Sequence, residues 1–282
     1  MEHNTVVLHD DALLPHWKEF ANAMQLYQKP EAFLGFCIYN VQLSTSVIDL
    51  LTPALRDKPI KGFELGNVEF ANAREGIAFA IEFIQSNRKL EEFGCVNSTI
   101  ESMADTNHLV EAIISHPTID KITLENCFGE NVNAYDILFS LLASNKEFSW
   151  IDLRSNNIQT GGGTEIPDFL VTNPPLEILS MANNHLGDND AVLIASALKR
   201  NTNLRNLHLG RNDITDVGRD ALRSAVFDSR SLNAVSDSNH SCCIDGLDLS
   251  DISNNRRVDS PEVNRGRKIY SLLSSRNIVA MD

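Results

Sequence analysis

The sequence has no long apolar run and no secretory signal. No apolar stretch approaches the roughly 18 residues that a membrane-spanning helix needs. Residues 1–17 combine neither the basic start nor the apolar core of a signal peptide. We therefore expect a cytoplasmic protein, with the nucleus as the other possible compartment, that does not bind membranes.

Basic residues are also scarce, and the cysteines do not form an even set. Lys and Arg number 24 against 38 Asp and Glu, which gives a net charge of −14. Phosphate would repel this charge, so we expect no nucleic acid partner. The five cysteines are odd in number and irregularly spaced, which argues against a disulfide framework. We expect a monomer that binds a protein of unknown identity.

One phrase occurs repeatedly along the chain. The stretch LEILSMANNHL at 176–186 returns as LRNLHLGRNDI at 204–214, and both fit L-x-x-L-x-L-x-x-N-x-L. Copies begin at residues 60, 90, 119, 148, 176 and 204, so the intervals are 30, 29, 29, 28 and 28 residues. Such a register indicates a repeat architecture. Degenerate copies are predicted near Glu31, with Leu34, Phe36 and Val41, and at Leu232, with Val235 but with Asp237 in the third apolar slot.

The second half of each repeat has helical spacing. Gly218, Leu222 and Val226 are four residues apart and define one helix face. Each repeat is thus a strand, a turn and a helix, and stacked repeats place their strands in one parallel sheet. Helix axes need about 10 Å whereas strands need about 4.8 Å. The stack therefore curves into an α/β horseshoe, with the sheet on the concave face and the helices on the convex face.

The asparagine of the phrase has a predicted structural role. It follows the strand, where backbone groups lose their sheet partners, and an amide can bond both kinds of group. Asn156, Asn184 and Asn212 occupy this slot, and Cys127 is a common replacement. Val68 and Ser98 depart from it, so we expect a weaker hydrogen-bond ladder in the N-terminal half.

These motifs resemble those of leucine-rich repeat proteins, and the 28- to 29-residue unit with a full helix resembles the ribonuclease-inhibitor type. The phrases EAIISHP, SNNIQTGGGTEIPDFLVTNPPLEIL, DSNHS and NRGRKIYSLLSSRN are similar to those of multi-copy intracellular repeat proteins of unicellular algae. The resemblance implies a solenoid that binds other proteins. It implies neither a catalytic centre nor a cofactor.

We expect three regions. Residues 1–30 form an N-terminal capping helix, residues 31–242 form about eight leucine-rich repeats of 28–30 residues, and residues 243–282 form a polar loop and a C-terminal capping helix. Asp10 and Asp11 cap the first helix, from about Ala12 to Tyr27. The last helix carries either a solvated basic face or a docking segment for an acidic partner, and its region holds six basic residues: Arg256, Arg257, Arg265, Arg267, Lys268 and Arg276.

Two stretches with chemical potential have structural interpretations. TGGGT at 160–164 lacks the Gly-Lys-Ser/Thr ending of a phosphate-binding loop, and Gly162 is needed at the turn of its repeat. HSCC at 240–243 has no second pair of ligands, so we predict no metal site. The histidines are scattered and no nucleophile–base arrangement is evident, so we predict no catalytic residues.

The expected binding surface is the concave face, whose residues lie between the apolar slots of each strand. Trp150 is either an interface anchor or a cover for its neighbours. Charge changes along this face from acidic to basic, which suits an oriented partner or reflects ordinary solvated strands. The candidate partner-binding residues are Glu64, Glu92, Lys121, Glu125, Trp150, Asp152, Arg154, Ile178, His208 and Arg211.

We therefore predict a non-enzymatic scaffold that binds a protein, including the case of an enzyme inhibitor, on the concave sheet. The alternative is a GTPase-activating protein, because the repeat type resembles that of activators of the Ran GTPase. In that case Arg154 or Arg211 would stabilise the phosphoryl transition state.

Overall fold

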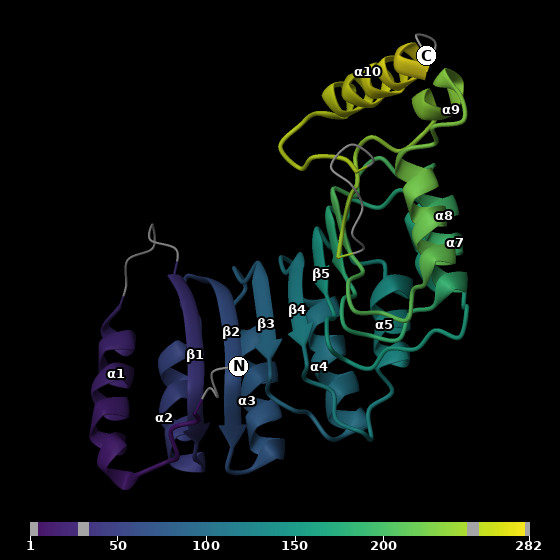
Figure 1. Cartoon of the computed structure of the whole chain (residues 1–282). Coiled ribbons are helices and arrows are strands. Elements are labelled where there is room, and N and C mark those ends of the chain that lie inside the picture. The colour runs from purple at the N-terminus through teal and green to yellow at the C-terminus, as the bar shows by residue number, and fades with distance from the viewer. Residues whose placement is uncertain (1–4, 28–33, 247–253, 280–282) are drawn as a thin grey trace. The chain divides into compact units, whose positions relative to one another are not determined.

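The fold was analysed in a computed structural model, which describes residues 5–27, 34–246 and 254–279 (Figure 1). Glu31, the predicted start of the first repeat, and the side chain of Arg276 lie outside the described residues. The chain divides into two compact units, Met1–Phe148 and Ser149–Asp282. Among the helices described, none is long and apolar enough to cross a membrane.

Strands and helices alternate through the N-terminal unit. After a short 3-10 helix, η1 (Asp11–Leu13), the described helices are α1 (Leu14–Leu26), α2 (Thr45–Leu55), α3 (Ala73–Ser86), α4 (Met103–Ser115) and α5 (Ala134–Ala143). The described strands are β1 (Leu34–Leu43), β2 (Ile60–Phe70), β3 (Glu92–Val96) and β4 (Lys121–Glu125). They pair in sequence order and in parallel, and the helices cover one of their faces (Figure 1).

The C-terminal unit repeats this arrangement with shorter strands. Its described strands are β5 (Trp150–Asp152), β6 (Ile178–Ser180), β7 (Asn206–His208) and β8 (Cys243–Asp245), again parallel and in sequence order. The described helices are α6 (Glu165–Val171), α7 (Asp188–Leu198), α8 (Asp216–Val226), α9 (Leu232–Ser236) and α10 (Pro261–Val279). The predicted α/β repeat solenoid with a parallel sheet is confirmed.

The apolar slots of the repeat form the core. In the N-terminal unit Phe63, Phe93 and Ile122 are in register across three strands and are at most 2% exposed. In the C-terminal unit Leu179 and Leu207 are also in register and fully buried. Burial of these side chains on stacking is what holds successive repeats together, because one repeat alone leaves them in water.

Polar residues fix where the helices begin. Ser44, Asn72, Ser102, Asn133 and Thr215 each accept a backbone N–H from the first turn of the helix that follows. Such N-caps satisfy donors that have no partner within the helix. The turn chemistry therefore ends each strand segment and starts the next helix at a defined residue.

The first strand is shifted relative to the sequence prediction. Phe36 pairs with Phe63, and Ile38 pairs with Leu65, so the apolar slots begin two residues later than the copy placed near Glu31. An irregularity between Leu34 and Gly35 allows this register. As a result Cys37 and Tyr39, rather than Gly35 and Cys37, occupy the fifth and seventh positions of the repeat, which lie between or beside the apolar slots on the strand.

The repeat predicted at Leu232 is wrong. Helix α9 occupies that segment, where Ser231 accepts the backbone N–H of Ala234 at 3.0 Å. The next strand is β8, in which Ile244 pairs with Leu207, 37 residues earlier, whereas Leu207 pairs with Leu179, 28 residues earlier. The extra residues form α9 and the turns beside it, and they end the regular spacing.

Six phenylalanine rings form a continuous cluster in the N-terminal unit, among them Phe79, which meets Phe63 edge to face at 6.1 Å. Phe20 stacks on Phe36 with 5.6 Å between ring centroids, and Phe36 stacks on Phe63 at 5.8 Å. Phe63 in turn stacks on Phe83 at 3.8 Å and lies 6.1 Å from Phe93. This cluster joins the first helix to the first three strands.

The last helix is held by buried polar groups. Asn264 and Lys268 are at most 1% exposed, and the Lys268 ammonium donates to the carbonyl of Val226 and, at 2.6 Å, to Oδ1 of Asn255. Burial, with the positive charge of Arg267 as a second cause, lowers the pKa of Lys268 to about 7. The interpretation of a solvated basic face is therefore wrong for Lys268.

Candidate functional site

The candidate residues lie on the strand face, the face of the strands opposite the helices, and they are divided between the two units. The N-terminal unit holds Glu64, Glu92, Lys121 and Glu125. The C-terminal unit holds Trp150, Asp152, Arg154, Ile178, His208 and Arg211.

Charged residues on the N-terminal strand face are mostly paired. Glu92 and Lys121 occupy neighbouring positions on β3 and β4 and form an ion pair, which raises the pKa of Lys121. The pair is substantially exposed, so it contributes little to stability. Glu64 is half-buried and lies near Tyr39, whose pKa is raised first by burial and then by this carboxylate. Tyr39 was not among the predicted site residues, because the sequence prediction placed the first repeat two residues too early.

Trp150 and Ile178 form an apolar patch on the C-terminal strand face. They are directly paired across β5 and β6, and Trp150 remains 37% exposed while Ile178 is half-buried. A large aromatic side chain that stays partly in water beside an aliphatic one is typical of interface anchors.

Asp152 is buried and fixes the guanidinium of Arg154. Its carboxylate is 2% exposed and accepts Nε of Arg154 at 3.0 Å and 2.9 Å, and its Oδ2 lies 2.9 Å from Nη2. The backbone N–H of Arg154 donates to the same carboxylate at 3.1 Å. Asp152 therefore offers little surface to a partner, whereas the side chain of Arg154, 42% exposed, is oriented before binding.

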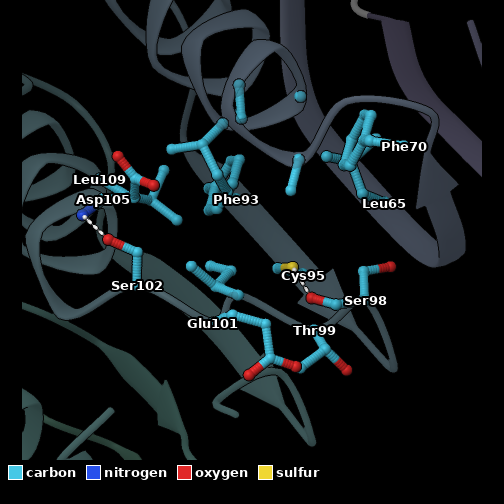
Figure 2. A pocket seen from close by; sticks show the side chains of 15 residues that line it. Leu65, Phe70, Phe93, Cys95, Ser98, Thr99, Glu101, Ser102, Asp105 and Leu109 are labelled. Atoms are coloured by element: carbon cyan, nitrogen blue, oxygen red, sulfur yellow. Dashed lines mark hydrogen bonds between the residues drawn. The ribbon is translucent and has the colours of Figure 1, made fainter. Parts of the chain in front are cut away.

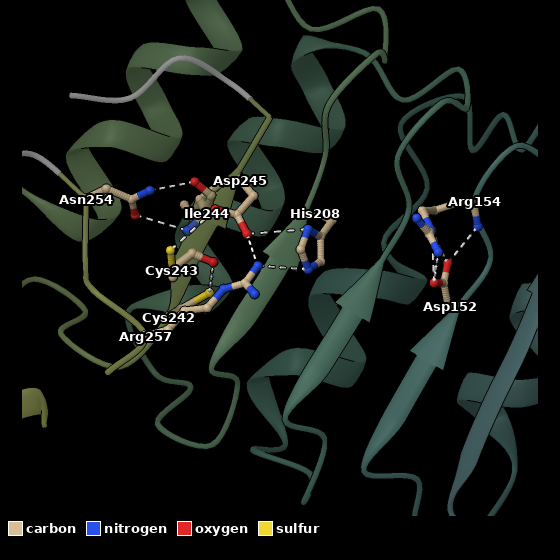
Figure 3. A network of polar contacts seen from close by, with 9 residues as sticks. All are labelled: Asp152, Arg154, His208, Cys242, Cys243, Ile244, Asp245, Asn254 and Arg257. Atoms are coloured by element: carbon tan, nitrogen blue, oxygen red, sulfur yellow. Dashed lines mark hydrogen bonds and ion pairs between the residues drawn. The ribbon is translucent and has the colours of Figure 1, made fainter. Parts of the chain in front are cut away.

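His208 belongs to a second polar cluster, shown in Figure 3. Its Nδ1 lies 3.4 Å from Oδ2 of Asp245, and its Nε2 lies 3.4 Å from Nη2 of Arg257, which also pairs with Asp245. Burial is the main cause that lowers the pKa of His208, and Asp245 opposes it. The sequence did not predict Asp245 and Arg257 as site residues, because the regular spacing of the repeats ends at α9.

The segment after residue 253 pairs with β8 through a side chain. Oδ1 of Asn254 accepts the backbone N–H of Ile244 at 3.0 Å, and Nδ2 donates to the Ile244 carbonyl at 2.6 Å (Figure 3). The amide thus bonds the backbone as a further strand would, which protects the edge of the sheet. It also holds Arg257 against the strand face.

The column Ser180–His208–Asp245 does not form a catalytic triad. The three residues are in register on β6, β7 and β8. However, Nε2 of His208 faces Arg257, Ser180 is 3% exposed, and no hydrogen bond joins Ser180 to His208 in the described part of the chain. A nucleophile needs a base within hydrogen-bond reach and access to substrate.

The residues at the eighth position of each repeat, counted from its first apolar residue, share a backbone conformation. Asn67, Asn97, Asn126 and Asn183 have φ between 48° and 55°, and Arg211 has φ 57°. Asparagine tolerates this left-handed region better than most residues. The asparagines also bond one another across strands, as Asn126 does to Asn97 at 2.8 Å, so their role is structural. Arg211 is exposed and departs from the asparagine rule.

An apolar cavity of about 60 Å³ lies within the N-terminal unit (Figure 2). Leu65, Phe93 and Leu109 form part of its lining, with Cys95 and Ser98 beside them. A water molecule takes about 30 Å³ of liquid volume, whereas ligand pockets measure about 300 Å³ or more. This cavity is therefore a packing defect near the degenerate slots of Val68 and Ser98, and not a ligand site.

The two cysteines of the HSCC stretch are buried, whereas His240 and Ser241 are half-buried. Cys242 is fully buried and Cys243 is 7% exposed, and burial raises the pKa of both thiols, to about 11 for Cys243. Within the described residues, no three His, Cys, Asp or Glu side chains come together in a way that could hold a metal ion.

Comparison with known protein families gives two matches to the family described as Leucine Rich repeat, over residues 172–195 and 200–222. The first match contains β6 and most of α7, and the second contains β7 and the first part of α8. Leucine-rich repeats are generally protein-interaction modules. Together with the parallel strand–helix repetition, these matches support the assignment of the chain as a leucine-rich repeat protein.

Proposed function

We propose that this chain is a non-enzymatic scaffold of the ribonuclease-inhibitor-like repeat type that binds a protein partner on its strand face. The centre of the interface is the patch formed by Trp150, Ile178 and Arg154. The observation that carries this proposal is the partial exposure of Trp150, 37%, beside a directly paired Ile178.

The composition of this patch matches the residues that dominate binding energies. Trp and Arg are enriched among interface hot spots because they combine large contact area with directional hydrogen bonds. Asp152 holds the Arg154 guanidinium in place, so less side-chain freedom is lost on binding. A net charge of −14 favours a protein partner with a basic surface over nucleic acid.

The proposed organisation retains a capping helix in residues 1–30, repeats in residues 31–242, and a loop with a capping helix in residues 243–282. Strand β8 (Cys243–Asp245) lies just beyond the repeat boundary, and α1 packs against α2. We propose a cytoplasmic or nuclear monomer.

The test is affinity capture from native lysate with the wild-type chain, followed by measurement of the dissociation constant for the captured protein. Trp150→Ala should weaken binding by about 2 kcal/mol, which is roughly thirtyfold. Val192→Ala is the matched control, because Val192 is an exposed apolar residue, 44% exposed, on helix α7 of the same unit. If Trp150→Ala binds as the wild type does while remaining folded, this centre is wrong.

A further inference from the structure

Tyr39 lies flat on the neighbouring strand in the N-terminal unit. It pairs with Gly66 across β1 and β2, and a Cβ atom at Gly66 would fall 2.2 Å from Cδ1 and Cε1 of the ring. Any residue other than glycine at this position would displace the ring. Tyr39 nevertheless remains 50% exposed, so its outer ring face is available to a partner.

Glu64 leans in the same direction, over Gly94. The two residues are paired across β2 and β3, and a Cβ atom at Gly94 would lie 2.8 Å from Cγ of Glu64. The Tyr39 hydroxyl lies near the Glu64 carboxylate, and burial followed by the influence of this carboxylate raises the pKa of Tyr39. Two glycines on adjacent strands thus allow an aromatic ring and a carboxylate to be held together on the strand face.

The backbone beside this pair is bare. Gly35 and Gly62 are paired on β1 and β2, two residues before Cys37 and Glu64. A Cβ atom at Gly35 would meet no atom within 4 Å, and one at Gly62 would make only ordinary contacts, at 3.7 Å or more, with Glu92. We call the surface formed by Gly35, Gly62, Tyr39 and Glu64, together with the exposed Cys37 that is paired with Glu64, the glycine slot.

Glu64 differs from other carboxylates of the strand face in its pairing. Glu92 pairs with Lys121, Asp152 with Arg154, and Asp245 with Arg257. Among the described residues no lysine or arginine pairs with Glu64. A half-buried carboxylate beside an exposed aromatic ring attracts a cation, both through its charge and through the negative face of the ring.

The chain itself shows what such a strand face accepts. In the C-terminal unit, Arg257 reaches from a separate segment onto the strand face and meets the Asp245 carboxylate and the His208 ring (Figure 3). The glycine slot presents the same combination, a carboxylate beside a ring. It differs in that Gly35 and Gly62 carry no side chain beside Cys37 and Glu64, and in that its cation is not supplied by a described residue.

We propose that the glycine slot binds an arginine side chain of a protein partner, with the guanidinium on Glu64 and against the ring of Tyr39. The aliphatic part of that arginine lies along the backbone of Gly35 and Gly62. This inference shares one premise with the proposed function, namely that the strand face binds a protein. It concerns the N-terminal unit, whereas Trp150 belongs to the C-terminal unit.

The test uses the full ¹⁵N-labelled chain and the peptide acetyl-Gly-Gly-Arg-Gly-Gly-amide, followed by NMR. We expect saturable shifts of the Gly35, Gly62, Gly66 and Gly94 amides with a millimolar dissociation constant. Glu64→Gln should weaken binding at least about tenfold, because a charge-assisted hydrogen bond is lost. Gly35→Leu should abolish binding, since the new side chain enters open space and fills the slot.

Several controls make the outcomes distinct. Glu69→Gln, on the same strand but outside the slot, and Trp150→Ala should both bind the peptide as the wild type does. The peptide with citrulline in place of arginine has the same shape without the charge and should not bind. The proposal is overturned if the citrulline or lysine peptide binds equally well, or if folded Glu64→Gln and Gly35→Leu retain wild-type affinity. Loss of the Trp150 effect alone would overturn only the proposed function.

Discussion

Asn184 shows how a single residue connects two repeats. It is 4% exposed, and its Oδ1 accepts the backbone N–H groups of Asn156 and Ile158, both at 3.0 Å. Its Nδ2 donates to the carbonyls of Leu153 at 3.0 Å and Met181 at 3.1 Å. The amide therefore satisfies buried backbone groups of the preceding repeat and of its own, as the sequence predicted.

Asn184→Ala should be strongly destabilising. The substitution leaves several buried backbone groups without partners, and each such loss costs about 1–3 kcal/mol. We expect the free energy of unfolding, measured in urea, to fall by about 3 kcal/mol. Ser98→Ala should cost less, because Ser98 supplies only the bonds to Val68 N–H at 2.9 Å and to the Val96 carbonyl at 3.2 Å. Equal losses for the two variants would contradict this account.

Arg211 illustrates a residue whose conformation the sequence did not reveal. Asparagine occupies the equivalent position in most repeats, and the sequence placed Arg211 among the partner-binding residues. The structure shows that a positive φ accounts for the asparagines. The periodicity of a strand predicts which side chains point outward but not the backbone angle at the residue where the strand ends.

Arg211→Asn should stabilise the protein. Left-handed backbone costs most L-residues about 1–2 kcal/mol, and asparagine adopts it more readily. We expect a gain of about 0.5 kcal/mol in the free energy of unfolding with an unchanged denaturant slope. Arg211→Ala is the control, since alanine removes the charge without favouring the conformation. A destabilised Arg211→Asn variant would show that Arg211 makes contacts that outweigh its backbone strain.

Among the helices, α10 lies where the sequence predicted a closing helix, but its buried side contains polar residues that were not predicted. The sequence predicted a closing helix with Ile269, Leu272 and Leu273 on one side. Leu272 is 6% exposed and Ile269 is half-buried, whereas Leu273 is 43% exposed, so the prediction is wrong for Leu273. Hydrophobic periodicity could not predict that Asn264 and Lys268 share this buried side, because both are polar. Lys268 donates to Asn255 and to the Val226 carbonyl at the end of α8, and Asn264 accepts the backbone N–H of Arg256 and donates to the His240 carbonyl.

The buried Lys268 predicts a pH dependence of stability. Its pKa is about 7 when folded, against an ordinary value of 10.5, so above pH 7 the unfolded chain binds one more proton than the folded chain. Stability then rises with pH until the unfolded lysine also titrates, and below about pH 7 the cost of the buried charge is fully present. Relative to Lys268→Met, the wild type should gain about 2 kcal/mol between pH 7 and pH 9.

The measurement is urea unfolding of both proteins at each pH, with Lys199→Met as the control because Lys199 is exposed. Arg265, Arg267, His240, Cys242 and Cys243 also influence this region, and they are common to all three proteins. The difference between wild type and Lys268→Met therefore isolates Lys268. Parallel stability curves for these two proteins would refute the prediction.

At the scale of the whole molecule, the two units differ in how completely their ladders are built. Asn156, Asn184 and Asn212 supply amides throughout the C-terminal unit, whereas Val68, Ser98 and Cys127 occupy the same slot in the N-terminal unit. The sequence predicted this asymmetry and the apolar strand positions of the core, such as Phe63, Phe93, Leu179 and Leu207. It predicted the site less well. Pairs such as Asp245 and Arg257 do not occupy equivalent positions of the repeat, so the spacing of the repeat could not reveal them.

The two tryptophans allow the units to be followed separately, since Trp17 lies in one and Trp150 in the other. Trp150→Phe leaves a reporter for the N-terminal unit, and Trp17→Phe leaves one for the C-terminal unit. We expect urea unfolding, followed by fluorescence, to give a higher midpoint for the C-terminal reporter, because repeat proteins lose two-state behaviour when units differ in stability. Coincident transitions would show that the units unfold as one.

The phenylalanine cluster has a consequence for how such a chain can lengthen. In the C-terminal unit, Leu179 and Leu207 are paired and equally buried. One 28-residue repeat could therefore be duplicated there, and the asparagine of the new repeat would bond its neighbours as the existing asparagines do. In the N-terminal unit, Phe63 contacts rings from the helix beneath it and from both adjacent strands. A module inserted there would separate these rings, so growth by duplication is expected to be tolerated only toward the C-terminal end.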